Sequence, residues 1–250
     1  MGYTIRKKNH ALIFTIARPD KRNAVNNEVM DGLEKAVTEA EQNDAVKALI
    51  ITGEGGEAFC SGGDLQEFHQ LKTQKESYEM LSKMGGILYR VATLNKVTVA
   101  FINGTAIGGG CEIATACDYR IARKGVKMGF VQGNLAITTG WGGGTLLYER
   151  LPLNQAFRLL TEAKIHSEET LKELGFIDQT VNALSAEDMI DLFEDVFKKT
   201  GPVLSAYKKM LNRKWASGDL RDRMESEIHE CSVLWEKDEH HEAVEKFLNK

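Results

Sequence analysis

Apolar and polar residues alternate at the start of the chain, over residues 3–17, on both sides of a turn at Asn9-His10. This period of two predicts an opening β-hairpin. From Val29 to Ala40 the apolar residues recur every three or four positions instead, which is typical of an amphipathic helix, here ending near Gln42. The N-terminal part of the chain is therefore expected to pair two strands and then cover them with a helix.

Two largely apolar runs, residues 46–52 and 97–102, predict buried strands, and residues 75–93 are expected to be helical. Strands and helices alternate in this way as far as about residue 150. Such alternation favours parallel strands joined by crossover connections. The sequence thus belongs to the α/β class.

The pattern changes after residue 150. From Leu153 onward we expect successive helices with short breaks at Ser167, Gly175, Ser185, Pro202 and Ser217. We therefore divide the chain into an α/β core over residues 1–195 and a C-terminal helical region over residues 196–250. A helical extension of this kind often packs on a neighbouring subunit, so we expect an oligomer.

Composition and charge exclude several classes of function. A net charge of −4 gives no general attraction to nucleic acid or to an anionic membrane, and no apolar run is long enough to span a bilayer. The four cysteines have neither a CxxC pair nor the spacing of a zinc site, so we expect reduced thiols and no metal. The charged start does not resemble a signal peptide, and a cytoplasmic location is expected.

Two glycine-rich segments stand out, because each follows a predicted strand and precedes a predicted helix. The first contains Ser61-Gly62-Gly63-Asp64, and the second contains Gly108-Gly109-Gly110-Cys111-Glu112. Glycines at a helix start allow backbone N–H groups to approach a ligand closely. Two such loops at the carboxyl ends of strands in one sheet could hold one carbonyl oxygen as it gains negative charge, beside the carboxylate of Glu112.

Other interpretations of these loops were weighed. A P-loop needs Gly-Lys-Ser/Thr, and a dinucleotide-binding turn needs GxGxxG after the first strand; neither loop fits. The glycines can instead serve turns and tight packing alone, and Glu112 can simply complement a helix dipole. Asp64 is better placed to cap its helix than to take part in chemistry.

Four segments, in this order and spacing, resemble the crotonase (enoyl-CoA hydratase/isomerase) superfamily. Residues 18–25 are similar to its RPxxxNA segment, residues 59–65 to F-x-[AS]-G-x-D-[IL], residues 103–118 to NGxxxGGGxELxxxCD, and residues 171–181 to a stretch ending GLVDxVV. The resemblance implies a spiral of ββα units with a C-terminal helical region, assembled as a homotrimer or a dimer of trimers. It also implies an acyl-CoA thioester as substrate, with coenzyme A as part of that substrate and no separate cofactor.

The resemblance assigns roles to individual residues. The N–H groups of Ser61 and Gly109 would form the oxyanion hole, and Glu112 would be the acid and base. The substrate and its coenzyme A moiety would contact Lys21, Arg22, Ala24, Ser61, Gly62, Gly63, Asp64, Leu65, Gly108, Trp141, Phe247 and Lys250.

The chain departs from the family pattern at the second catalytic glutamate. Asn134 is our preferred match for that position and Gln132 the alternative, so the carboxylate is replaced by an amide, which cannot accept a proton at neutral pH. Asn134 would then orient water or substrate beside Glu112. We predict hydration of a 2-enoyl-CoA to a 3-hydroxyacyl-CoA; the alternatives are an alkylmalonyl-CoA decarboxylase and a non-catalytic CoA- or RNA-binding member of the family.

Overall fold

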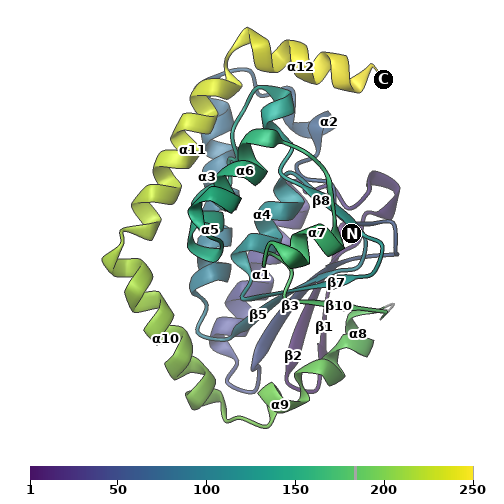
Figure 1. Cartoon of the computed structure of the whole chain (residues 1–250), viewed down its shortest axis with the longest axis vertical. Helices are drawn as coiled ribbons and strands as arrows, with labels where there is room; N and C mark the ends of the chain where they lie inside the picture. Colours follow the sequence, from purple (N-terminus) through teal and green to yellow (C-terminus); the bar gives the residue numbers. More distant parts are fainter. Residues whose placement is uncertain (183–184, 250) are drawn as a thin grey trace.

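The alternating residues at the start of the chain form the expected hairpin, which opens a six-stranded sheet (Figure 1). The computed structural model describes residues 1–182 and 185–249, apart from the side chain of Glu187. The sheet has the order β1-β2-β3-β5-β7-β10, antiparallel between β1 and β2 and parallel elsewhere. Its strands are β1 Tyr3–Lys8, β2 Ala11–Ile16, β3 Ala48–Gly53, β5 Val97–Ile102, β7 Tyr119–Arg123 and β10 Gln179–Val181.

A second, four-stranded sheet has the order β4-β6-β8-β9. Its strands are short: β4 Ala58–Cys60, β6 Thr105–Ile107, β8 Lys127–Gly129 and β9 His166–Ser167. Strands β3, β5 and β7 of the large sheet are each followed by one strand of this small sheet and then by helix. This repetition is the expected spiral of ββα units.

The expectation of helices alone after Leu153 is wrong at β9 and β10. Strand β10 pairs in parallel with β7, with Thr180 opposite Ala122, and β9 pairs with β8. Strands of two or three residues are too short to display a period of two, so pairing with an existing sheet edge decides their structure.

The central strands are apolar on both faces because helices cover both faces of the large sheet. On β2, Leu12 and Phe14 join one core cluster, whereas Ala11 and Ile13 join the other. The first cluster includes residues of α1 and α3, and the second includes Ala186, Met189, Ile190 and Phe193. The helices and 3₁₀ helices are η1 Pro19–Lys21, α1 Asn27–Gln42, α2 Leu65–Phe68, α3 Gln74–Thr93, α4 Gly109–Ala116, η2 Gln132–Leu135, α5 Gly143–Arg150, α6 Leu153–Glu162, α7 Glu168–Glu173, α8 Ala186–Met189, η3 Ile190–Phe193, α9 Glu194–Phe197, α10 Gly201–Ser217, α11 Leu220–Trp235 and α12 Asp238–Leu248.

Helices α10 to α12 run as an arc along one side and one end of the molecule, with α11 packed against α3 (Figure 1). A buried ion pair fastens α10: the Nζ of Lys208 donates to Asp118 Oδ1 at 2.6 Å and to the carbonyl of Ala92 at 3.0 Å. Burial lowers the pKa of the Lys208 ammonium, which the Asp118 carboxylate counteracts. The division of the chain at residue 195 and the role of its last part in trimer formation stay predictions.

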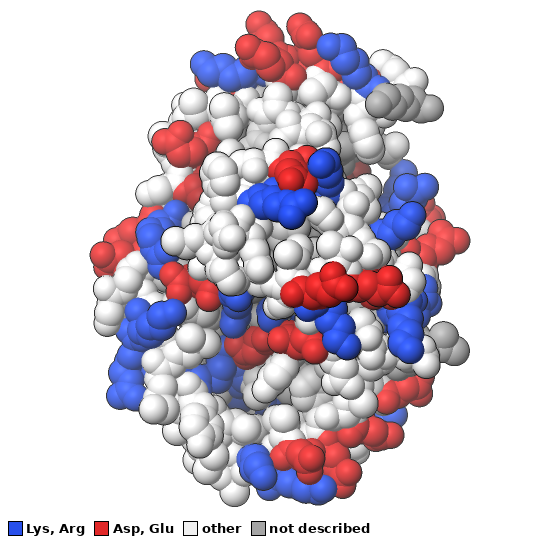
Figure 2. Space-filling view, in the orientation of Figure 1, with Lys and Arg blue, Asp and Glu red and all other residues white. Residues whose placement is uncertain are grey.

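The surface shown in Figure 2 intermingles Lys and Arg with Asp and Glu side chains. All four cysteines are buried free thiols. Within residues 1–182 and 185–249 no helix combines the length and apolar character needed to cross a membrane. The same residues contain no group of three or more His, Cys, Asp or Glu side chains placed to hold a metal ion.

Candidate active site

The two glycine-rich loops lie side by side because β4 and β6, the strands before them, pair in parallel. A methyl group added to Gly62 would lie 3.3 Å from the backbone nitrogen of Gly109. Gly62 has a φ of +96° and Gly108 a φ of +55°, in the region that favours glycine. The sequence therefore uses glycine here both for backbone conformation and for close approach of the loops.

Two backbone N–H groups at this contact are free to bind a ligand. Gly109 is the first residue of α4, and within the described residues neither its N–H nor that of Gly63 donates a hydrogen bond. The N–H of Ser61, the expected donor, instead donates to the carbonyl of Arg22 at 3.2 Å. Ser61 is thus replaced by Gly63 as the free donor opposite Gly109.

Glu112 is buried in the first turn of α4, with 2% of its surface exposed. Its Oε2 accepts the N–H groups of Trp141 at 2.8 Å and Gly143 at 3.0 Å. Its Oε1 accepts the Nε2 of Gln132 at 2.9 Å, with the N–H of Gly140 at 3.4 Å. Burial, and secondarily the negative charge of Glu227, raise the pKa of the Glu112 carboxyl to about 7, against the opposing effect of the backbone donors. A carboxyl with this pKa can both donate and accept a proton near neutral pH.

The amide that faces Glu112 belongs to Gln132 and not to Asn134, the preferred candidate. Asn134 is exposed, and its Nδ2 donates to the carbonyl of Ala163 at 2.8 Å. Both residues lie in η2, where three residues make a turn, so positions 132 and 134 point in different directions. Register in so short a helix cannot be read from periodicity, which is why the sequence left both amides open.

Trp141 forms a wall over the two free donors. Its indole packs so closely on Gly109 that an added methyl group there would collide with it, and a methyl group on Gly63 would lie 3.6 Å from the ring. The indole is itself almost wholly buried. Trp141 therefore limits the space beside the donors, and its contact with substrate stays a prediction.

Sequence reasoning missed Glu227, a partly buried residue of α11. Its carboxylate accepts the N–H groups of Gly144 at 3.0 Å and Thr145 at 2.6 Å, in the same turn that binds Glu112. Burial raises the pKa of this carboxyl as well. The helix carries three exposed acidic residues besides Glu227, at positions 222, 225 and 230, so no local pattern distinguishes the one that points inward.

The residues expected to contact coenzyme A surround the first loop. Lys21 and Arg22 are exposed, and their segment is bonded to the loop through Ser61 and through Val25, whose N–H donates to the carbonyl of Gly62 at 2.8 Å. Asp64 caps α2 by accepting the N–H of Gln66 at 3.0 Å, as its capping role predicted.

The remaining expected contacts are spread along the chain. Ala24 is buried and Leu65 half-buried beside this loop, whereas Phe247, in the last turn of α12, is 56% exposed. Lys250 lies outside the described residues. Contact of any of these residues with coenzyme A stays a prediction.

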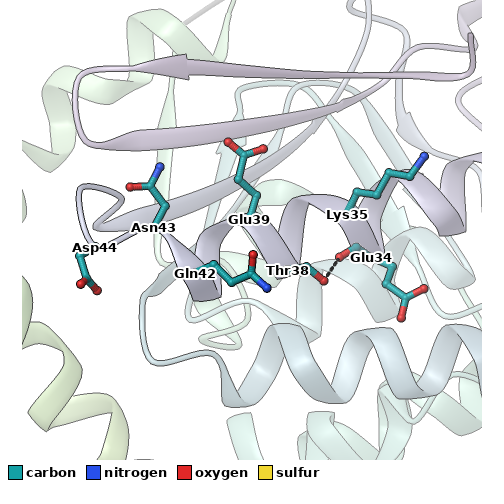
Figure 3. Close-up of a pocket in the computed structure, with 7 residues that line it drawn as sticks. All are labelled: Glu34, Lys35, Thr38, Glu39, Gln42, Asn43 and Asp44. Carbon is teal, nitrogen blue, oxygen red and sulfur yellow. Dashed lines mark hydrogen bonds between the residues drawn. The ribbon is translucent and has the colours of Figure 1, made fainter.

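A separate depression lies along α1 and the turn after it (Figure 3). It shares no residue with the glycine-rich loops. Its lining is polar: Glu34, Lys35, Thr38, Glu39, Gln42, Asn43 and Asp44. No feature of this lining resembles the buried carboxylate and free backbone donors described above, so the candidate site is the one around Glu112.

Comparison with known proteins identifies the family of this chain. The family model for enoyl-CoA hydratase/isomerase matches residues 6–250. Crotonyl-CoA hydratase of Syntrophomonas wolfei is 32% identical over 80% of this chain and 75% of its own length, and ethylmalonyl-CoA decarboxylase of Xenopus laevis is 33% identical over 88% and 74%. The crystal structure of enoyl-CoA hydratase from Bacillus halodurans superposes with a TM-score of 0.88 at 25% identity, over 98% of this chain and 100% of that one. The chain therefore belongs to the enoyl-CoA hydratase/isomerase family, the crotonase superfamily that its glycine-rich loops resemble.

Proposed function

We propose that this protein is a lyase that adds water to a 2-enoyl-CoA to give a 3-hydroxyacyl-CoA. The observation that carries the proposal is the placement of Glu112, a buried carboxyl with a pKa of about 7, three residues after the free N–H of Gly109. The hydratases among the relatives support the same reaction.

The N–H groups of Gly63 and Gly109 would bind the thioester oxygen. As water attacks C3 of the enoyl group, electrons move to that oxygen, and the two donors stabilise the resulting enolate. Removing one donor of such a pair typically costs about 3 kcal/mol of transition-state stabilisation. Ser61 is not part of this proposed pair, since its N–H is already bonded to Arg22.

Glu112 would act alone in both proton transfers. As carboxylate it accepts one proton from the attacking water, whose oxygen bonds to C3, and it then returns that proton to C2 of the enolate. The other hydrogen stays on the new hydroxyl group, so the product differs from the substrate by one water. A carboxyl with a pKa close to the operating pH is suited to this alternation.

Gln132 would position both Glu112 and the water. Its Nε2 fixes Oε1 of Glu112, while its own Oε1 is buried with no hydrogen-bond partner within the described residues. The amide lies beside Gly108, next to the proposed oxyanion donor. That unpartnered oxygen is an acceptor for one hydrogen of the attacking water.

The test is a steady-state assay with crotonyl-CoA, following loss of the conjugated thioester absorbance. Glu112→Gln is expected to lower kcat/KM at least about 100-fold, the usual contribution of a general acid and base. The matched control is Glu230→Gln, which removes an exposed charge from α11. Full activity of Glu112→Gln on crotonyl-CoA would show that the role given to Glu112 is wrong.

The second candidate is decarboxylation of an alkylmalonyl-CoA. It is favoured by the sequence of η2, which carries the amides of Gln132 and Asn134 and no carboxylate to assist hydration, and by the ethylmalonyl-CoA decarboxylase relative. Here the C2–carboxylate bond breaks, CO2 leaves, and Glu112 protonates the enolate at C2. Release of CO2 from ethylmalonyl-CoA, with no hydration of crotonyl-CoA, would select this reaction over the first.

We also propose a homotrimer or a dimer of trimers in the cytoplasm. Three large apolar side chains on α10, those of Val203, Tyr207 and Met210, are exposed in the single chain, and Tyr207 is 69% exposed. Exposed apolar groups on one helix favour contact with another subunit. Light scattering of the purified protein measures the assembly mass directly, and a monomer at micromolar concentration would contradict the proposal.

A further inference from the structure

Carboxylates from two other helices cap the N-terminus of α5. Its N-cap residue is Gly142, with a φ of +83° and no side chain to accept a hydrogen bond. Glu112 of α4 accepts the N–H of Gly143, and Glu227 of α11 accepts those of Gly144 and Thr145. The first three N–H groups of α5 are thus shared between two acidic residues far apart in the sequence.

We propose that Glu227 is a positioning residue for Glu112: it holds the turn that binds Glu112 and places a second carboxylate at the same helix N-terminus, from which its charge acts on Glu112. The effect on turnover rests on the proposed function of Glu112 as acid and base. Glu227 is not assigned any contact with substrate.

Packing of α11 fixes Glu227 against this turn. Methyl groups added to Gly142 or Gly85 would collide with Met224 and Ile228, which flank Glu227 on α11. A methyl group on Gly144 would lie 2.6 Å from Thr139 Oγ1 and 3.4 Å from both oxygens of Glu227, so glycine at 144 leaves room for the Thr139 hydroxyl beside that carboxylate. The acidic group is therefore built into the site by the contacts of its own helix.

The charges around the pair favour a retained proton. The negative charge of Glu227 contributes to the raised pKa of Glu112, after burial. The other titratable groups facing them are the thiols of Cys111 on α4 and Cys231 on α11, and burial raises the pKa of both, so they stay neutral. From η2 the facing group is the neutral amide of Gln132. The donors at the helix N-terminus oppose the shift but do not cancel it.

The experiment is a ¹³C NMR titration of side-chain carboxyls in the full-length protein labelled at glutamate Cδ. Signals are assigned by their loss in Glu112→Gln and Glu227→Gln. In the wild type we expect the Glu112 signal to titrate near neutral pH. In Glu227→Gln we expect its midpoint to fall by at least about one pH unit, the size typical of removing a neighbouring like charge. Glu230→Gln, one turn along α11 and exposed, should leave the midpoint unchanged.

A second variant separates charge from structure. Glu227→Asp keeps the charge on a shorter side chain, and we expect it to restore most of the midpoint shift, and the pH dependence of kcat/KM with it. A purely structural role would instead make Asp and Gln equally damaging without moving the midpoint. If Glu227→Gln fails to fold, a wild-type Glu112 signal that titrates in the ordinary carboxyl range is enough to overturn the proposal.

The titration is independent of the reaction. If crotonyl-CoA and ethylmalonyl-CoA both fail as substrates but the midpoint still depends on Glu227, the proposed function fails and the pairing stands. If hydration is efficient and the midpoint is the same in wild type and Glu227→Gln, the pairing is wrong and the proposed function stands.

Discussion

Replacing Glu112 by Gln should change the pH dependence of stability as well as activity. The carboxylate accepts N–H groups from Trp141 and Gly143 through Oε2, and one amide oxygen can retain both bonds. The new amide nitrogen would face Gln132, whose buried Oε1 has no partner within the described residues. Rotation of the Gln132 side-chain amide would present that oxygen to the new donor, so we expect the variant to fold.

The magnitude follows from the pKa of the carboxyl. Burial raises it from the usual 4.5 to about 7 in the folded protein. Below about pH 4.5 the Glu112 carboxyl is protonated in both the folded and the unfolded protein and does not affect stability. As the pH rises, the carboxyl ionises first in the unfolded protein, so the free energy of unfolding falls until the pH passes about 7. The free energy of unfolding of the wild type falls by about 3 kcal/mol in total, and the Glu112→Gln variant lacks this decrease.

Urea denaturation of both proteins at about pH 5 and about pH 9 measures this difference. The stability of Glu112→Gln relative to wild type should rise by about 2–3 kcal/mol between those pH values. Glu230→Gln, exposed on α11, should show no such change. A relative stability of Glu112→Gln that is the same at both pH values would refute the assignment of a raised pKa to Glu112.

Three further substitutions, two of them paired with a comparison variant, test separate parts of the structure. Gln132→Leu should lower kcat about 10- to 100-fold, because the Glu112 carboxylate loses the amide that orients it. Asn134→Ala should keep kcat within about twofold of wild type. Equal effects of the two substitutions in steady-state assays would restore Asn134 as the candidate. Gly109→Ala should abolish measurable turnover and lower the free energy of unfolding by about 1–3 kcal/mol, because its methyl group collides with the indole of Trp141. An assay with crotonyl-CoA measures the turnover, and urea titration measures the stability. Lys208→Met should cost about 3 kcal/mol in urea titration by breaking a buried ion pair, whereas Lys209→Met, at an exposed position, should be neutral.

Long periodic segments were predictable from sequence, and the elements that complete the site were not. The hairpin, α1, α3 and β5 follow directly from apolar patterns, because each is long enough to show its period. The glycine-rich loops marked the position of Gly109 and Glu112 through the chemistry of a strand followed by glycines and a helix. These features are local, and local sequence determines them.

The rest depends on contacts between distant segments. The donor opposite Gly109 is decided by whether the N–H of Ser61 is already bonded to Arg22, which no motif reveals. The amide facing Glu112 depends on the orientation of a single turn of 3₁₀ helix. Glu227 enters the site only because α11 folds back onto α3 and α5. In each case tertiary packing selects among residues that the sequence presents as equivalent.

The capping of α5 by Glu112 and Glu227, which belong to other helices, also affects how this protein folds. A helix of eight residues whose N-terminus is glycine has little stability by itself. Its opening N–H groups find acceptors only after α4 and α11 have docked, so the turn from Gly140 to Thr145 cannot form early as an independent unit. The ordering of this turn around Glu112 therefore depends on completion of the whole fold. In a chain whose α11 has not docked, the turn would not hold Glu112 in position for proton transfer.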